Sequence, residues 1–108
     1  MSSHPIRISL PPSAQRGEVI EVGVLIQHDM ESGYRRDAFG QAIPRNILKR
    51  FECVHAGETV FAAELFPGIA ANPYLSFFMR AQVSGPVAFT WTDQHGESWS
   101  ESRELVVT

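Results

Sequence analysis

Hydrophobic and polar positions alternate along much of this chain. Between residues 18 and 28, one face of the expected strand carries Ile20, Val22, Val24 and Ile26. Between residues 74 and 83, one face carries Leu75, Phe77, Met79, Ala81 and Val83. A period of two places one side of an antiparallel strand on a core and the other side nearer solvent, so the pattern predicts β-strands and no long helix.

Turn-forming residues separate the strands at the spacing of a β-sandwich. The turns are Pro11-Pro12-Ser13, Ala56-Gly57, Ser84-Gly85-Pro86 and Gln94-His95-Gly96. The strands they delimit span residues 6–10, 18–28, 47–55, 58–66, 74–83, 87–93 and 97–107. About seven strands in roughly 100 residues predict an all-β, immunoglobulin-like antiparallel sandwich, which forms a single domain over residues 1–108.

Two segments depart from this strand rhythm. Residues 29–46 make a loop longer than compact domains usually carry, and such loops are functional or disordered. Residues 67–73 lie between two prolines and hold more apolar side chains than a solvated loop needs. Because protein interfaces are enriched in Met, Tyr, Phe and Arg, we expect a partner to cover both segments. The predicted interface residues are Met30, Tyr34, Arg35, Arg36, Phe39, Ile43, Pro44, Arg45, Asn46, Phe66, Ile69, Asn72 and Pro73.

Composition narrows the class of protein. Hydrophobic residues make up 44% of the 108 residues and charged residues 19%, which is typical of a globular chain. The net charge of -3 argues against a nucleic-acid binder or a polybasic membrane surface. No apolar run reaches the length of a transmembrane helix, and the N-terminal residues do not resemble a signal peptide.

Two groups of polar residues could carry chemistry, and each has a structural alternative. His28-Asp29 with Glu31 could bind a metal or act in acid–base catalysis, but the spacing matches no ligand motif and fits a polar strand end. Asp93, His95 and Ser98 hold the residue types of a hydrolase triad within one short turn. Triad members normally converge from separate elements, so a polar turn is the preferred interpretation. No catalytic residue, cofactor or metal site is predicted.

Cys53 is the single cysteine, so the chain can form no internal disulfide. On an apolar strand face it is expected to be a small buried hydrophobe. A reactive thiol would need exposure and a lowered pKa. Arg35, Arg36, Asp37 and Arg45 could form an anion site, an interface patch or a solvated charged surface.

The chain resembles the SoxZ family, whose members are subunits of the bacterial sulfur-oxidation (Sox) system. The likeness runs over almost the whole sequence, and it is the order of the matching pieces that is specific. In the family a proline often stands at Asp29 and a threonine at Ser32. The matching stretches are Ile6-Arg7-Ile8-Ser9-Leu10-Pro11, Gly17-Glu18-Val19-Ile20-Glu21, His28-Asp29-Met30-Glu31-Ser32-Gly33, Arg35-Arg36-Asp37, Ile43-Pro44-Arg45-Asn46-Ile47, Leu65-Phe66-Pro67-Gly68-Ile69-Ala70-Ala71-Asn72-Pro73-Tyr74-Leu75, Phe89-Thr90-Trp91-Thr92-Asp93 and Gly96.

The resemblance implies a non-catalytic subunit of a SoxYZ carrier complex. A SoxY-like partner would bear the cysteine that carries covalent sulfur intermediates during thiosulfate oxidation, while other Sox enzymes make transient contact. It also implies a periplasmic heterodimer that is exported with its partner, and a chain without that partner is expected to self-associate. Two alternatives stay open: a thiol carrier or redox enzyme that uses Cys53, and a generic immunoglobulin-like adhesion or sugar-binding module.

Overall fold

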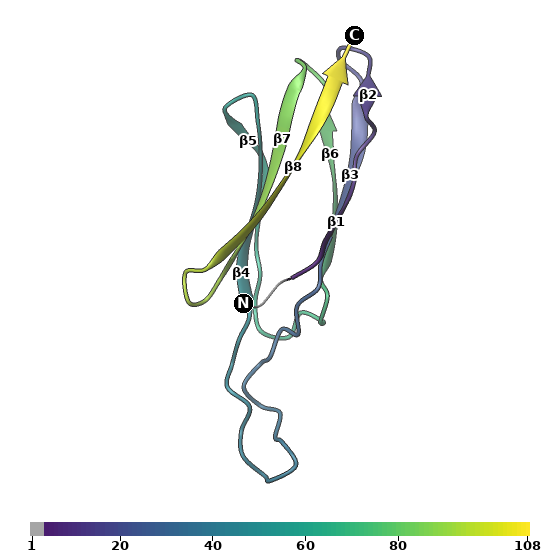
Figure 1. The fold of residues 1–108 in the computed structure, drawn as a ribbon. Coiled ribbons are helices and arrows are strands. Elements are labelled where there is room, and N and C mark those ends of the chain that lie inside the picture. The colour runs from purple at the N-terminus through teal and green to yellow at the C-terminus, as the bar shows by residue number, and fades with distance from the viewer. Residues whose placement is uncertain (1–3) are drawn as a thin grey trace.

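A computed structural model describes residues 4–108 and contains eight β-strands and no helix in that range (Figure 1). The strands are β1 (Ile6–Ser9), β2 (Ser13–Ala14), β3 (Val19–Ile26), β4 (Leu48–His55), β5 (Glu58–Glu64), β6 (Tyr74–Arg80), β7 (Gly85–Asp93) and β8 (Ser98–Val107). They form a three-stranded sheet of order β1-β3-β6 and a five-stranded sheet of order β2-β8-β7-β4-β5. The predicted all-β, immunoglobulin-like sandwich is confirmed.

The first strand of the sandwich is divided between the two sheets. β1 pairs antiparallel with β3, whereas β2 pairs parallel with β8 in the other sheet, with Ser13 opposite Val106. Pro11 and Pro12 lie between them, where the chain crosses from one sheet to the other. The sequence correctly predicts the end of β1 at this point, but it misses the short strand that follows.

The core forms where the inner faces of the two sheets meet. Ile20, Val22, Val24 and Ile26 are all buried, as the alternation predicts. From the opposite sheet, the ring of Phe51 packs 4.9 Å from that of Trp91 between centroids, and the Phe61 and Phe77 rings stack at 4.4 Å across the sheets. These aromatic contacts fill the space between the two inner faces, where a β-sandwich has its core.

One inward position is predicted wrongly. Val83 was expected to continue the buried face of the strand that starts at Tyr74, but its side chain is 47% exposed. β6 ends at Arg80, and Val83 lies in the turn before β7. Ala81 is the last apolar side chain of this run that the core covers completely.

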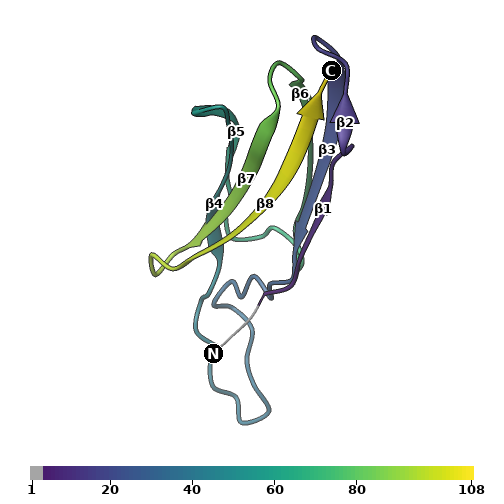
Figure 2. The ribbon, with the colours of Figure 1, turned by 45° about the horizontal axis from the view of Figure 1, so that its top comes forward.

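The molecule is elongated, with principal extents of 58 × 23 × 19 Å. Residues 29–46, which we call the projecting loop, account for the narrow extension beyond the sheets between β3 and β4 (Figures 1 and 2). Residues 65–73, called here the β5–β6 loop, close the same end of the sandwich. None of the residues from 4 to 108 belongs to a helix long and apolar enough to cross a membrane.

Candidate functional site

The projecting loop is a hydrogen-bonded hairpin rather than an irregular excursion. At its base Glu31 and Asn46 form an antiparallel bridge, with N–O distances of 2.9 and 2.8 Å. Further out, the Ile43 amide donates to the Arg35 carbonyl at 2.8 Å. Gly33 has a φ of +93°, and any Cβ at this position would approach the Cβ of Arg45 to 3.2 Å, so a glycine lets the two arms lie close.

Asp37 organises the tip of the hairpin. Its Oδ1 accepts hydrogen bonds from the amides of Phe39 at 2.8 Å and Gln41 at 3.0 Å. Arg36 donates from its guanidinium to the carbonyl of Gly40 at 2.9 Å. Asp commonly stabilises turns in this way. The backbone of the tip is therefore satisfied by local polar contacts, and no apolar side chain is needed to hold it.

Two aromatic side chains of the hairpin are left almost fully in solvent. Tyr34 is 88% exposed and Phe39 is 89% exposed. Beside Tyr34, the Arg35 guanidinium forms an ion pair with Glu31, and its Nε donates to Oε2 at 3.3 Å. The hydrogen bond from Arg35 lowers the pKa of Glu31. Tyr and Arg are among the residue types enriched at the energetic centres of protein interfaces.

A clamp formed by His28 and Asn72 ties the projecting loop to the β5–β6 loop. The His28 amide donates to Asn72 Oδ1 at 3.0 Å, and the Asn72 amide donates to the His28 carbonyl at 2.7 Å. His28 Nδ1 in turn accepts a hydrogen bond from the Met30 amide at 2.9 Å. Met30 and Asn72 have φ values of 54° and 53°, so the bonds hold both residues in a conformation that L-residues seldom adopt.

His28 lies inside this clamp and is only 3% exposed. Its imidazole ring stacks on the ring of His4, and the His4 ring meets Trp99 edge-on. Burial lowers the pKa of His28, and the nearby charge of His4 lowers it further, against opposing effects of Asp29 and Asp93. Residues 4–108 contain no group of three or more His, Cys, Asp or Glu side chains placed to hold a metal ion.

The thirteen predicted interface residues divide by exposure. Nine side chains are exposed, namely Tyr34, Arg35, Arg36, Phe39, Pro44, Arg45, Asn46, Phe66 and Asn72. Ile43 and Ile69 are half-buried, and Met30 and Pro73 are buried. The sulfur of Met30 accepts from the Leu48 amide at 3.3 Å, so Met30 anchors the hairpin in the core instead of offering a surface.

Cys53 is fully buried between the sheets, as expected of a structural residue. Burial raises the pKa of its thiol to about 12. A thiol of this kind is neither accessible nor ionised near neutral pH, so it is unsuited to carrying or exchanging sulfur. The structure thus argues against the thiol-carrier interpretation of Cys53.

Asp93 has a structural role in the turn before β8. Its Oδ1 accepts from the amides of His95 at 2.8 Å and Glu97 at 2.9 Å. The carboxylate therefore faces backbone donors, which matches the polar-turn interpretation of this cluster.

Sequence reasoning missed two surfaces. One is the outer face of the three-stranded sheet, where Val19, Tyr74 and Phe78 are 51%, 61% and 66% exposed. The sequence could have predicted this face, because Tyr74 and Phe78 are next to the inward-facing Leu75 and Phe77 and must therefore point outward. The other is a pocket beside the β5–β6 loop that includes Lys49 and Arg50. No signal in the strand pattern predicts it, since both residues sit in a regular-looking strand.

Comparisons with known proteins agree with the fold. The family model described as SoxZ, sulphur oxidation protein SoxZ, matches residues 6–104. A comparison with curated proteins found no match.

Several solved structures share the architecture at low sequence identity. A superoxide reductase (neelaredoxin) from Ignicoccus hospitalis is 16% identical with a TM-score of 0.69, covering 95% of this chain and 79% of that one. The sulfur carrier protein SoxY from Chlorobium limicola f thiosulfatophilum is 17% identical with a TM-score of 0.66, covering 95% of this chain and 78% of that one. At such identities the likeness concerns the fold alone.

Proposed function

The chain belongs to the SoxZ family of sulphur oxidation proteins, and from this premise we propose that it binds a SoxY-like subunit through the projecting loop. Within this SoxYZ carrier complex the partner supplies the cysteine that carries sulfur intermediates. This subunit supplies a rigid support and no catalytic group. The observation that carries the proposal is a hydrogen-bonded hairpin that presents Tyr34 and Phe39 at 88% and 89% exposure.

The hairpin has an ordered backbone, and this order favours a role in binding a partner. Association costs free energy wherever loops must be fixed, and this loop is already fixed by Asp37 at its tip and by the Glu31–Asn46 bridge at its base. A backbone that is fixed in this way loses little conformational entropy when the aromatic side chains it carries meet a partner. Phe66, on the β5–β6 loop, is 60% exposed and would extend the same surface.

The state of Cys53 supports a division of labour. Its thiol is buried and its pKa is raised to about 12, so it cannot serve as the carrier nucleophile. A carrier cysteine must therefore come from another chain. We further propose a periplasmic heterodimer that other Sox enzymes contact transiently, and self-association of the chain when its partner is absent.

Co-purification of the tagged chain from cells that oxidise sulfur, with intact-mass analysis, tests the complex. The expected result is a stoichiometric second chain that bears a Gly-flanked cysteine and mass additions of sulfur or thiosulfate size. Recovery of this chain alone would favour a generic immunoglobulin-like binding module instead.

Variants of the exposed aromatics test the proposed surface. Phe39→Ser and Tyr34→Ser are each expected to weaken partner binding more than tenfold, as interface aromatics commonly do. Phe78→Ser is the matched control, because Phe78 is 66% exposed on the outer face of the three-stranded sheet. Weaker binding by Phe78→Ser, together with unchanged binding by both hairpin variants, would move the interface to that sheet face.

A further inference from the structure

A pocket of about 410 Å³ lies where the projecting loop returns to the sandwich. It is bounded by the end of that loop, the start of β4 and the end of β5. The residues that line it are Arg45, Ile47, Lys49, Arg50, Glu64, Leu65, Phe66 and Pro67. Its location next to Arg45 and Phe66 makes it continuous with the surface proposed to meet the partner.

A β-bulge gathers two of its cations on one side of β4. Leu48 pairs with Asp93 and Arg50 pairs with Thr92 on β7, so Lys49 is the extra residue without a partner on that strand. The alternation breaks accordingly: Leu48 is buried, Lys49 and Arg50 are both exposed, and the inward pattern resumes after them. Bulges commonly re-aim side chains in this way.

The bulge is also fixed from the other edge of β4. The amide of Leu65 donates to the carbonyl of Lys49 at 2.8 Å, so the β5–β6 loop begins directly against the bulged residue. This bond places the apolar wall of the pocket, formed by Leu65 and Phe66, beside the two cationic side chains.

The pocket has an excess of positive charge. Three cations, Arg45, Lys49 and Arg50, line it together with one acid, Glu64. Arg50 also pairs with Glu52 at 3.1 Å, whereas within residues 4–108 no ion pair involves Arg45 or Lys49. The whole chain carries a net charge of -3, so this local cluster runs against the general balance. A bound anion would relieve the mutual repulsion of the cations.

The other half of the lining is apolar, which narrows the kind of anion. Phe66 and Pro67, backed by the buried Ile47 and Leu65, give an apolar surface that a bare inorganic ion could not use. A carboxylate next to an apolar side chain would match both halves, because guanidinium groups bind carboxylates through paired hydrogen bonds. Charge complementarity of this type sets the orientation and specificity of protein docking.

We propose that this pocket binds a short acidic segment of a partner protein, in which a Glu or Asp carboxylate meets the three cations and a neighbouring apolar side chain packs on Phe66. The proposal goes beyond the pairing described above, because any partner that bears such a segment can use the pocket. It involves binding only and requires no covalent step.

Titration of the isotopically labelled full chain with acetyl-Phe-Glu-Leu-Glu-amide, followed by NMR, tests the proposal. Shifts at the Lys49 and Arg50 amides are expected, and the binding should weaken as salt is added. The same peptide with Gln in place of both Glu should bind at least about tenfold more weakly, since the charge-assisted hydrogen bonds are lost.

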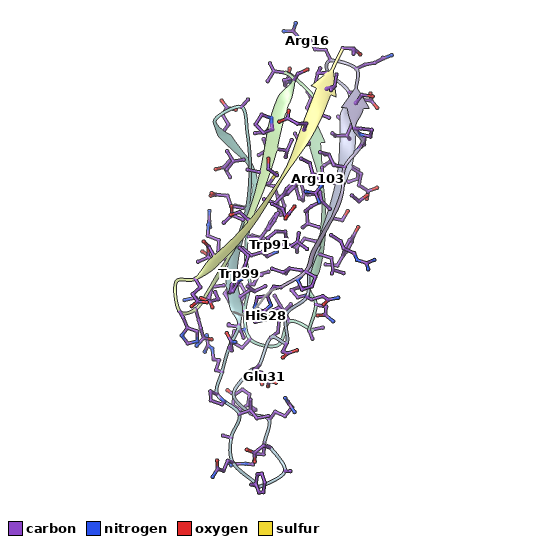
Figure 3. The ribbon with its side chains drawn as sticks, viewed as in Figure 1. Arg16, His28, Glu31, Trp91, Trp99 and Arg103 are labelled. Carbon is purple, nitrogen blue, oxygen red and sulfur yellow. The ribbon has the colours of Figure 1, made fainter. Side chains whose placement is uncertain are left out.

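Charge variants give opposite expectations. Lys49→Gln should weaken binding of the acidic peptide by about tenfold, and Glu64→Gln should strengthen it, because a repelling carboxylate is removed. Arg16→Gln is the matched control, since Arg16 is exposed at the far end of the molecule from the projecting loop (Figure 3). It should leave the affinity unchanged.

Three results would overturn the proposal: equal binding of the acidic and amide peptides, no shift at Lys49 and Arg50, or binding of sodium acetate or sulfate as tight as that of the peptide. The last result would indicate a site for free oxyanions. None of these bears on the pairing with a SoxY-like chain, which the co-purification measures separately.

Discussion

Removal of the Asn72 side chain should loosen the clamp between the two loops by a predictable amount. Asn72 Oδ1 is the acceptor for the His28 amide at 3.0 Å, and a shielded donor left without a partner costs about 1–3 kcal/mol. In Asn72→Gly the positive φ of 53° becomes unstrained, which offsets part of that loss. We therefore expect a net destabilisation of about 1–2 kcal/mol for this variant.

Asn72→Ala should be worse than Asn72→Gly. It loses the same acceptor but keeps a Cβ in the left-handed region, where a residue without a local polar contact pays about 1–2 kcal/mol more. Total destabilisation of about 2–4 kcal/mol is expected. Asn46→Ala is the control, because Asn46 is exposed and it is the backbone of Asn46 that bonds to Glu31 in the hairpin base. It should change stability by less than about 0.5 kcal/mol.

Urea unfolding measures the free energies, and hydrogen exchange at the His28 amide reports the clamp directly. Protection of that amide should fall in both Asn72 variants and stay unchanged in Asn46→Ala. If Asn72→Gly were as stable as the parent chain, the hydrogen bond would contribute nothing. If Asn72→Ala were no less stable than Asn72→Gly, the argument from backbone strain would be wrong.

Three further predictions concern the turn at Ala56, the buried imidazole and the buried thiol. Ala56 and Gly57 both have positive φ in the two-residue turn between β4 and β5, where Asn-Gly is the preferred sequence. Ala56→Asn should therefore stabilise the chain by about 0.5–1 kcal/mol and raise the urea midpoint. An unchanged midpoint would contradict this. The pKa of His28 is lowered from 6.5 in the folded chain, so the unfolded chain protonates this imidazole at a higher pH than the folded chain does. The free energy of unfolding therefore decreases as the pH falls below about 6.5. His28→Asn should reduce this loss in unfolding curves at pH 7.5 and 5, and the exposed His95→Asn should not. Cys53 should resist iodoacetamide at pH 8 until denaturant is added, and fast native labelling would refute its burial.

Local pattern was enough to predict most of the sandwich. Strands such as β3 can be predicted from the sequence because their apolar residues repeat with a period of two. In β3 these residues are Ile20, Val22, Val24 and Ile26, and all four are buried in the core. β2 could not be found in this way. It is only two residues long, and it exists because Ser13 meets Val106 near the other end of the chain. Pairings between such distant residues leave no periodic trace.

The candidate site was predictable in outline and not in detail. Length and composition marked the projecting loop, and Tyr34 and Phe39 are indeed left in solvent. Composition could not separate these residues from Met30, which is equally apolar but returns to the core as an anchor. The cationic pocket was missed because Lys49 and Arg50 come together only through a one-residue slip against β7, which depends on the partner strand.

The parallel pairing of β2 with β8 has a consequence for how the chain folds. Residue 13 can find its partner only after residue 106 has been synthesised, so the β2–β8 edge of the five-stranded sheet forms late. Until then one edge of β7, the central neighbour of β8, is open to other strands. Proteins dominated by such distant contacts fold in milliseconds to seconds, as a rough guide. A chain in which β8 has not yet docked is therefore exposed to edge-to-edge aggregation.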